Sequence, residues 1–170
     1  MRKIILGLAS SLDGYIEGPN GEIDWCFTDQ DYGMKEFLSH VDTSIMGRKT
    51  YELTQTLGGN SFPNLQEYVF SKSLKSVKEP ALLVDGDLKT EIDKIKSSPG
   101  KDIWLFGGAE FTTSLMNLGF VNEIWLSVHP VVLGGGKSIF IDLKNRANLN
   151  LTDTKTYPTG LVSLTYHIRH

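Results

Sequence analysis

The feature that most constrains the fold is an alternation of short apolar runs with segments that carry apolar residues at helical spacing. Runs of strand length are found at residues 2–10, 43–46, 67–70, 81–84 and 102–106. Segments with one apolar face follow them at residues 31–41, 48–57, 88–95 and 111–118. Strands that alternate with helices pair in parallel, because each helical crossover returns the chain to the same end of the sheet. We therefore predict an α/β domain with a mostly parallel central sheet and helices on both faces.

The last third of the chain has a different pattern. Strands are expected at residues 121–129, 149–157 and 161–168, and no segment of helical length separates the last two. Thr159-Gly160 is typical of a hairpin tip. This pattern predicts an antiparallel edge at the C-terminal side of the sheet. No repeat or linker divides the chain, so we expect residues 1–170 to form one domain.

Composition excludes several classes of protein. Seventeen basic and twenty acidic residues give a net charge of −3, which provides no positive field for nucleic acid. The apolar runs are too short to span a membrane, and the first residues resemble a strand more than a signal peptide, so we expect a cytoplasmic protein. Cys26 is the only cysteine, and the four histidines lack metal-ligand spacing. We therefore expect neither disulfides nor a metal site.

The first functional signal is a junction of strand, glycine and helix at Met46-Gly47-Arg48-Lys49-Thr50. Basic residues in the first turn of a helix oppose the helix dipole, which favours acids there by about 0.3–1 kcal/mol each. An anion bound at this helix N-terminus would remove the conflict for Arg48 and Lys49. The alternative is that both side chains point into solvent, where the cost is small.

A second junction is found at Phe106-Gly107-Gly108-Ala109. Paired glycines between a strand and a helix let a phosphate approach the backbone, although they also occur in ordinary tight turns. The spacing matches neither the Gly-x-Gly-x-x-Gly fingerprint nor a P-loop. Parallel strands bring both junctions to one edge of the sheet, where they would clamp a dinucleotide pyrophosphate. Ser71 and Lys72, after another strand, could bind a further phosphate.

A long loop at residues 11–29 could close over such a site, since loops of this length are often functional. Asp31 begins the apolar face of the next helix, where partial desolvation would raise its pKa toward that of a useful acid. The alternative is a capping box, Thr28-x-x-Asp31, in which Asp31 only accepts backbone hydrogen bonds. Asp13 is a second carboxylate in the loop or part of a turn, and Trp25 lines a pocket or fixes the loop to the core.

Four motifs, in order, resemble those of a known family. They are Leu8-Ala9-Ser10-Ser11-Leu12-Asp13-Gly14-Tyr15-Ile16, Met46-Gly47-Arg48-Lys49-Thr50-Tyr51-Glu52, Phe106-Gly107-Gly108-Ala109 and Val128-His129-Pro130-Val131-Val132-Leu133-Gly134-Gly135-Gly136. Together they resemble the dihydrofolate reductase-like fold. Within that fold, the chain is similar to the C-terminal reductase half of the bifunctional riboflavin-pathway deaminase–reductase. The resemblance covers residues 3–168.

The resemblance implies an NADPH-dependent reductase and assigns roles to residues. The residues expected near the coenzyme phosphates are Gly47, Arg48, Lys49 and Thr50, with Ser71 and Lys72 near the 2′-phosphate. Those expected at the pyrophosphate are Gly107, Gly108 and Ala109, with Glu110 and Phe111 beside it. Ala9 and Ile16 would flank the nicotinamide, and Ser127 would lie on the strand that borders both nicotinamide and substrate. With Asp13 and Trp25 of the loop, whose candidacy comes from the residues alone, Ser127 completes the candidate substrate residues. Glu110 departs from the pattern, because folate-reducing relatives often carry a basic residue there.

The implied reaction is hydride transfer to a pyrimidine ribosylamine phosphate, as in 5-amino-6-(5-phosphoribosylamino)uracil reductase, or to a related heterocycle. Asp31, near the acidic position of folate reductases, is the candidate catalytic acid. Two alternatives are a dihydrofolate or pterin reductase and a nucleotide-binding protein without turnover. The resemblance also implies a homodimer, and the apolar strand at residues 124–126 is compatible with a buried edge.

Overall fold

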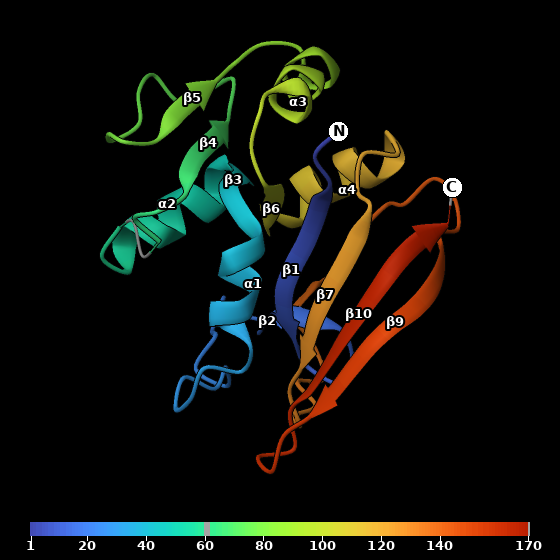
Figure 1. Ribbon diagram of the computed structural model, residues 1–170. Coiled ribbons are helices and arrows are strands. Elements are labelled where there is room, and N and C mark those ends of the chain that lie inside the picture. Colours follow the sequence, from blue (N-terminus) through green and yellow to red (C-terminus); the bar gives the residue numbers. More distant parts are fainter. Residues whose placement is uncertain (60–61, 170) are drawn as a thin grey trace.

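The computed structural model describes residues 1–59 and 62–169. Its main sheet is built from β1 (Ile4–Ser10), β3 (Val41–Gly47), β4 (Gln66–Phe70), β5 (Leu82–Val84), β6 (Asp102–Gly107), β7 (Glu123–Val128), β9 (Asn148–Thr156) and β10 (Val162–Arg169). The strand order is β5-β4-β3-β6-β1-β7-β10-β9 (Figure 1). The first six strands in this order are parallel, whereas β10 runs antiparallel to both β7 and β9. The predicted parallel sheet with an antiparallel C-terminal edge is confirmed.

Four helices cover the two faces of this sheet: α1 (Met34–His40), α2 (Arg48–Thr56), α3 (Leu88–Ser97) and α4 (Ala109–Asn117). Successive residues of a strand point to opposite faces, and β1 shows the consequence. Ile4 and Leu6 belong to the core cluster that includes Ile92 of α3 and Leu115 of α4. Ile5 packs instead with Phe37 of α1. None of the helices in the described part of the chain is long and apolar enough to cross a membrane.

The predicted element boundaries agree with the structure to within about two residues, except around α1. The helix expected at residues 31–41 begins only at Met34, because Tyr32 and Gly33 have left-handed backbone conformations with φ of 50° and 86°. The chain then passes from α1 directly into β3, so that strand begins at Val41 and not at residue 43.

A second sheet joins a short strand inside the segment expected to be a loop, residues 11–29, to a short strand that follows the glycine run at residues 134–136. β2 (Tyr15–Glu17) pairs antiparallel with β8 (Lys137–Ser138). Gly136 makes this pairing possible, because a Cβ there would lie 2.0 Å from the carbonyl oxygen of Glu17, at a φ of 134° that favours glycine. Through this pairing, the glycine run brings Lys137 back against the loop that follows β1. The sequence did not indicate these two strands, because strands of three and two residues are too short to show a periodic pattern.

The expectation that residues 124–126 form a sheet edge is wrong. They belong to β7, which is paired on both sides, to β1 and to β10. On this side the edge of the sheet is β9, all of whose residues are exposed, including Leu149 and Leu151, and the opposite edge is β5. A homodimer therefore stays a prediction, and β9 replaces β7 as the edge available for pairing.

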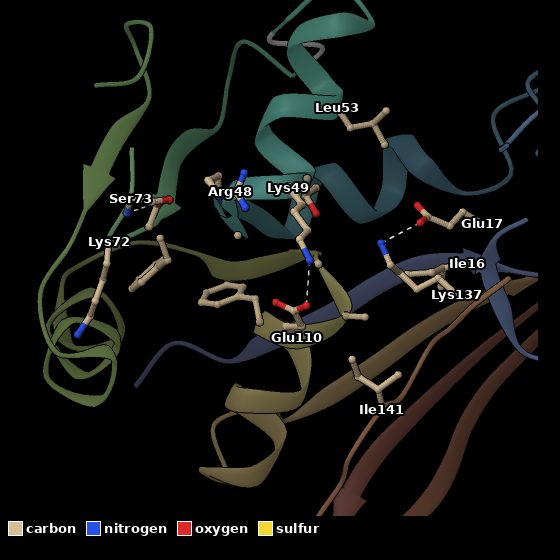
Figure 2. Close-up of a pocket in the computed structure, with 17 residues that line it drawn as sticks. Ile16, Glu17, Arg48, Lys49, Leu53, Lys72, Ser73, Glu110, Lys137 and Ile141 are labelled. Carbon is tan, nitrogen blue, oxygen red and sulfur yellow. Dashed lines mark hydrogen bonds and ion pairs between the residues drawn. The ribbon is translucent and has the colours of Figure 1, made fainter. Parts of the chain in front are cut away.

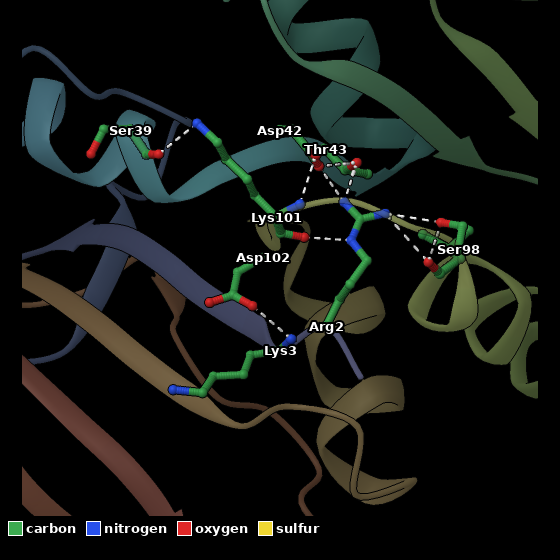
Figure 3. Close-up of polar contacts among 9 residues, drawn as sticks. Arg2, Lys3, Ser39, Asp42, Thr43, Ser98, Lys101 and Asp102 are labelled. Atoms are coloured by element: carbon green, nitrogen blue, oxygen red, sulfur yellow. Dashed lines mark hydrogen bonds and ion pairs between the residues drawn. The ribbon is translucent and has the colours of Figure 1, made fainter.

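At the amino end of the parallel strands, the Arg2 guanidinium binds three other segments of the chain (Figure 3). It donates hydrogen bonds to the Asp42 carboxylate and the Thr43 hydroxyl at the start of β3. It also binds the Lys101 carbonyl just before β6 and the Ser98 hydroxyl after α3, the latter at 3.1 Å. The Arg2 side chain is only 7% exposed. A buried guanidinium with this many acceptors holds the starts of the strands together.

Candidate functional site

A cavity of about 470 Å³ opens at the carboxyl ends of β3, β4 and β6, where α2 and α4 begin (Figure 2). It is lined by Ile16, Glu17, Gly47, Arg48, Lys49, Thr50, Leu53, Phe70, Ser71, Lys72, Ser73, Gly108, Ala109, Glu110, Phe111, Lys137 and Ile141. The two glycine junctions, predicted to meet at one edge of the sheet, do meet here. A Cβ added to Gly108 would lie 3.2 Å from the Thr50 hydroxyl, which shows how closely the two turns approach.

The helices that begin at this cavity have no side-chain caps. Gly47 precedes α2 and Gly108 precedes α4, and neither helix receives a side-chain hydrogen bond at its N-cap. α3 differs, because the Asp87 carboxylate accepts a hydrogen bond of 3.0 Å from the Thr90 N–H. The first N–H groups of a helix need acceptors from outside the helix. At α2 and α4 these donors are available to an anionic ligand.

Two cations of α2 form ion pairs at the cavity. The Arg48 guanidinium binds both carboxylate oxygens of Glu52, at 3.0 and 2.9 Å, and Lys49 Nζ binds Glu110 at 2.9 Å. The hydrogen bond and charge of Lys49 hold the pKa of Glu110 below its usual value. Arg48 and Lys49 are 40% and 58% exposed, so solvent screens each ion pair and each contributes little to stability. Both cations can therefore exchange their partner for a ligand phosphate at small cost.

The ends of the cavity carry two more lysines, Lys72 at one end and Lys137 at the other (Figure 2). Lys137 Nζ binds Glu17 at 2.8 Å across the small sheet. Sequence analysis did not identify Lys137 as a site residue, although the glycines before it could have indicated that the chain turns back there. The other lining residues that it did not identify are Glu17, Leu53, Phe70, Ser73 and Ile141.

Two of the lining side chains give the cavity an apolar wall. The rings of Phe70 and Phe111 lie 5.0 Å apart between their centroids. Near them, the Ser71 hydroxyl accepts hydrogen bonds from the N–H groups of Ser73 and Leu74, at 3.2 and 3.1 Å. Its oxygen also lies 3.3 Å from the Ser73 hydroxyl oxygen, where either hydroxyl can be the donor. A phosphate oxygen could accept from these hydroxyls in place of that contact.

The predicted site residues Ala9, Gly107 and Ser127 are not among the residues that line the cavity. Gly107 ends β6, directly before Gly108. Ala9 and Ser127 are register partners on β1 and β7, so they lie side by side near the carboxyl ends of these strands. Their assigned places at the nicotinamide and the substrate stay predictions.

The predicted desolvation of Asp31 is wrong, because this residue is exposed. Its carboxylate accepts a hydrogen bond of 3.1 Å from the Lys35 N–H, and its carbonyl accepts one of 3.0 Å from the Met34 N–H. Asp31 thus accepts a backbone hydrogen bond in the first turn of α1, as the simpler alternative expected. The capping box Thr28-x-x-Asp31 is wrong, because the N-cap of α1 is Gly33, which has no side-chain cap. The role of Asp31 as the catalytic acid stays a prediction, and burial of its carboxyl group does not support it.

Asp13 and Trp25 hold the loop after β1 in place. The Asp13 carboxylate accepts hydrogen bonds from the N–H groups of Leu133 and Gly134, at 3.1 and 2.8 Å. The pKa of Asp13 is lowered, most strongly by a hydrogen bond with Ser11 and less strongly by the hydrogen bonds from Gly134 and Leu133. Trp25 donates to the Glu22 carbonyl at 3.2 Å and packs edge-on against His129. Neither side chain lines the cavity, and their contact with substrate stays a prediction.

His129 anchors the far part of the same loop. It is buried, and its Nε2 accepts a hydrogen bond of 3.1 Å from the Phe27 N–H, while Nδ1 lies 3.1 Å from the Ser127 carbonyl. Burial lowers the pKa of His129. Among residues 1–59 and 62–169, no three His, Cys, Asp or Glu side chains are grouped to hold a metal ion, and His170 lies outside the described residues.

Residues 2–163 match the family model of the RibD C-terminal domain. The chain belongs to the RibD C-terminal domain family. It is 44% identical to the uncharacterized Bacillus subtilis protein YyaP, over 98% of this chain and 95% of YyaP. It is 36% identical to a second uncharacterized protein of that organism, YwjB, over 92% of each chain.

Solved structures share the fold of this RibD C-terminal domain. A putative riboflavin biosynthesis protein from Shewanella sp. PV-4 has a TM-score of 0.88 at 24% identity, with both chains fully covered. A deaminase/5-amino-6-(5-phosphoribosylamino)uracil reductase from Thermotoga maritima has a TM-score of 0.75 at 14% identity, covering 99% of this chain and 57% of that one. Dihydrofolate reductase from Enterococcus faecalis, in a complex with NADP(H), has a TM-score of 0.74 at 15% identity, over 99% and 97% of the two chains. The predicted dihydrofolate reductase-like fold is confirmed.

Proposed function

We propose that this protein is an NADPH-dependent reductase that transfers hydride to a pyrimidine ribosylamine phosphate or a related heterocycle. One observation carries the proposal: two helices without side-chain caps begin at a single cavity, and Arg48 and Lys49 flank it. Free N–H groups, helix dipoles and cations that converge in this way suit a pyrophosphate. The cavity volume of about 470 Å³ is within the range of roughly 300–1,000 Å³ typical of ligand sites.

The cavity residues fit the parts of a phosphorylated dinucleotide. The pyrophosphate would bind the first turns of α2 and α4. Ser71, Lys72 and Arg48 would bind the 2′-phosphate, which favours NADPH over NADH. Phe70 and Phe111 offer an apolar wall to a planar ring, and Ile16 lines the end of the cavity that holds Lys137, where the nicotinamide would lie.

The bound coenzyme would supply the hydride, and the chain would supply position and charge. The acceptor is a carbon of a C=N bond or of a ring-opened sugar carbonyl. That carbon takes the hydride, its nitrogen or oxygen takes a proton, and the coenzyme leaves as NADP⁺. Support for the substrate class comes from membership of the RibD C-terminal domain family and from the reductase name of the Thermotoga maritima protein.

Turnover assays with three acceptors test this function. We expect NADPH to be oxidised stoichiometrically with a ribosylaminopyrimidine phosphate, as followed by the absorbance of the reduced nicotinamide. Oxidation with dihydrofolate or another pterin, and none with the pyrimidine, would identify a pterin reductase instead. Tight NADPH binding without hydride transfer to any acceptor would identify a nucleotide-binding protein without turnover.

A further inference from the structure

We propose that Glu110 sets the affinity of the cavity for phosphorylated ligands by competing with the ligand phosphate for Lys49. This inference rests on the proposed function and names a residue that tunes it. Glu110 is the second residue of α4 and Lys49 the second residue of α2, and 61 positions separate them in the sequence. Their 2.9 Å ion pair joins the first turns of the two helices (Figure 2). It therefore lies where the free N–H groups of both helices converge.

Glu110 acts as the resident anion of this site. Its carboxylate is held by Lys49 and lies at the positive end of the α4 dipole. A ligand pyrophosphate would seek these same positive groups. Because the Lys49 and Glu110 side chains are 58% and 75% exposed, the ion pair is weak enough to open.

Opening the ion pair costs binding energy in two ways. Lys49 must leave a carboxylate before it can bind a phosphate, and the released carboxylate then lies beside a like charge. The pair between Arg48 and Glu52 is different, because both residues belong to α2 and Glu52 does not line the cavity. Among the cavity carboxylates, Glu110 is the one that joins the two helix N-termini, so its charge opposes the ligand most directly.

The first test compares the NADPH dissociation constants of the wild type and Glu110→Gln by calorimetry. Glutamine keeps the size of the side chain and removes its charge. We expect the NADPH dissociation constant to fall about three- to tenfold. Asp93→Asn is the matched control, because it removes an exposed ion pair with Lys89, 3.1 Å long, from α3 outside the cavity lining. It should leave the dissociation constant unchanged. Equal or weaker binding by Glu110→Gln would overturn the proposal.

A double-mutant cycle separates competition for Lys49 from direct repulsion of the ligand. In a Lys49→Gln background there is no cation to release, so Glu110→Gln should improve NADPH binding much less than it does in the wild type. An equal gain in both backgrounds would contradict the exchange of partners. Thermal melting of each variant, compared with the wild type, checks that it is folded.

Inorganic pyrophosphate provides a probe that is independent of the coenzyme. Glu110→Gln should bind pyrophosphate more tightly than the wild type, by a factor similar to that for NADPH. If the wild type binds NADPH and neither ligand gains from the substitution, the proposed function stands and the role of Glu110 is lost. If the wild type does not bind NADPH but pyrophosphate binding still tightens, the proposed function fails and the ion-pair exchange stands.

Discussion

The two ends of the parallel sheet use cations in opposite ways. At the amino end, the Arg2 side chain is 7% exposed and donates to the Asp42 carboxylate, the Thr43 hydroxyl and the Lys101 carbonyl (Figure 3). At the carboxyl end, Arg48 and Lys49 are 40% and 58% exposed, and each binds an exposed carboxylate. Figure 2 shows the pair of Lys49 with Glu110. A buried cation cannot leave its acceptors without leaving them unsatisfied, whereas an exposed cation can. The contacts of Arg2 therefore favour stability at the amino end, whereas Arg48 and Lys49 can exchange their partners, as the proposed function requires.

The helix N-termini at the carboxyl end show the same difference. Asp87 caps α3 with its own carboxylate, whereas α2 and α4 begin with Gly47 and Gly108 and have no side-chain cap. A helix start that has its own acceptor needs no ligand. α1 also has a glycine N-cap, but the Asp31 carboxylate accepts a hydrogen bond from the Lys35 N–H in its first turn. The starts of α2 and α4 have no such side-chain acceptor at the N-cap, and both line the cavity.

The largest effect is expected from Arg2→Met, which keeps the length of the side chain but removes its hydrogen bonds. We expect the free energy of unfolding to fall by about 3 kcal/mol, since Arg2 is buried and its acceptors lose their donor. Urea unfolding measures this loss. The NADPH dissociation constant of the folded protein should not change. If the free energy of unfolding fell by less than about 0.5 kcal/mol, Arg2 would not stabilise the amino end of the sheet more than Arg48 and Lys49 stabilise the carboxyl end.

Arg48→Ala should have the opposite effects from Arg2→Met: little change in stability and weaker binding of NADPH. We expect stability to change by less than about 0.5 kcal/mol, because the pair with Glu52 is exposed. The NADPH dissociation constant should rise about tenfold, as expected for the loss of a charge-assisted hydrogen bond, and the NADH constant should rise less. Calorimetry with both coenzymes measures the two constants. Equal losses for NADPH and NADH would contradict the placement of Arg48 near the 2′-phosphate.

The substitution Asp42→Asn tests the amino end of the sheet through the pH dependence of the free energy of unfolding. Partial burial of Asp42 opposes its ionisation, but hydrogen bonds from the Lys101 N–H and the Thr43 hydroxyl, with the charge of Arg2, hold its pKa below the usual value. A carboxyl with a lowered pKa stabilises the fold above its unfolded pKa of about 3.9, and this contribution is lost as the pH falls through the folded pKa.

We therefore expect Asp42→Asn to lose about 1 kcal/mol of unfolding free energy at neutral pH, since Asp42 is partly exposed. The difference from the wild type should shrink below about pH 4. Urea unfolding at a series of pH values measures it. A difference that does not depend on pH would show that the charge of Asp42 does not matter.

The smallest effect is expected from Asp31→Asn. The Asp31 carboxylate is exposed and accepts from the Lys35 N–H, and asparagine can keep that hydrogen bond. We expect kcat to change by less than about twofold and its pH profile to keep its shape. A loss of about a hundredfold would restore Asp31 as the proton donor, since general acids contribute roughly that much or more.

Sequence reasoning predicted the sheet and the meeting of the two glycine junctions because both depend on local patterns. Apolar runs of strand length gave β1, β3 and β6, and the residues around Gly47 and Gly108 gave the two helix starts at the cavity. The rule that parallel strands share their carboxyl ends was enough to bring these two junctions together.

The rest depends on contacts between distant segments. Lys137 reaches the cavity because β8 pairs with β2, and Lys49 meets Glu110 across 61 residues. Neither contact can be predicted from a periodic pattern in the sequence. The exposure of Asp31 follows from the left-handed backbone of Tyr32 and Gly33, which starts α1 later than its apolar pattern predicts. β7 is interior because β10 adds beside it, and strand order cannot be read from an apolar run.

Binding of NADPH to the folded protein tests most directly whether the carboxyl end of the sheet is a coenzyme site. Calorimetry and thermal melting should be done with the wild type at low and high salt, with NADH in parallel. We predict saturable binding of NADPH, a raised melting temperature and weaker binding at high salt, because exposed cations hold the phosphates. No heat of binding and no change in melting temperature with NADPH, for folded protein at low salt, would contradict the coenzyme site.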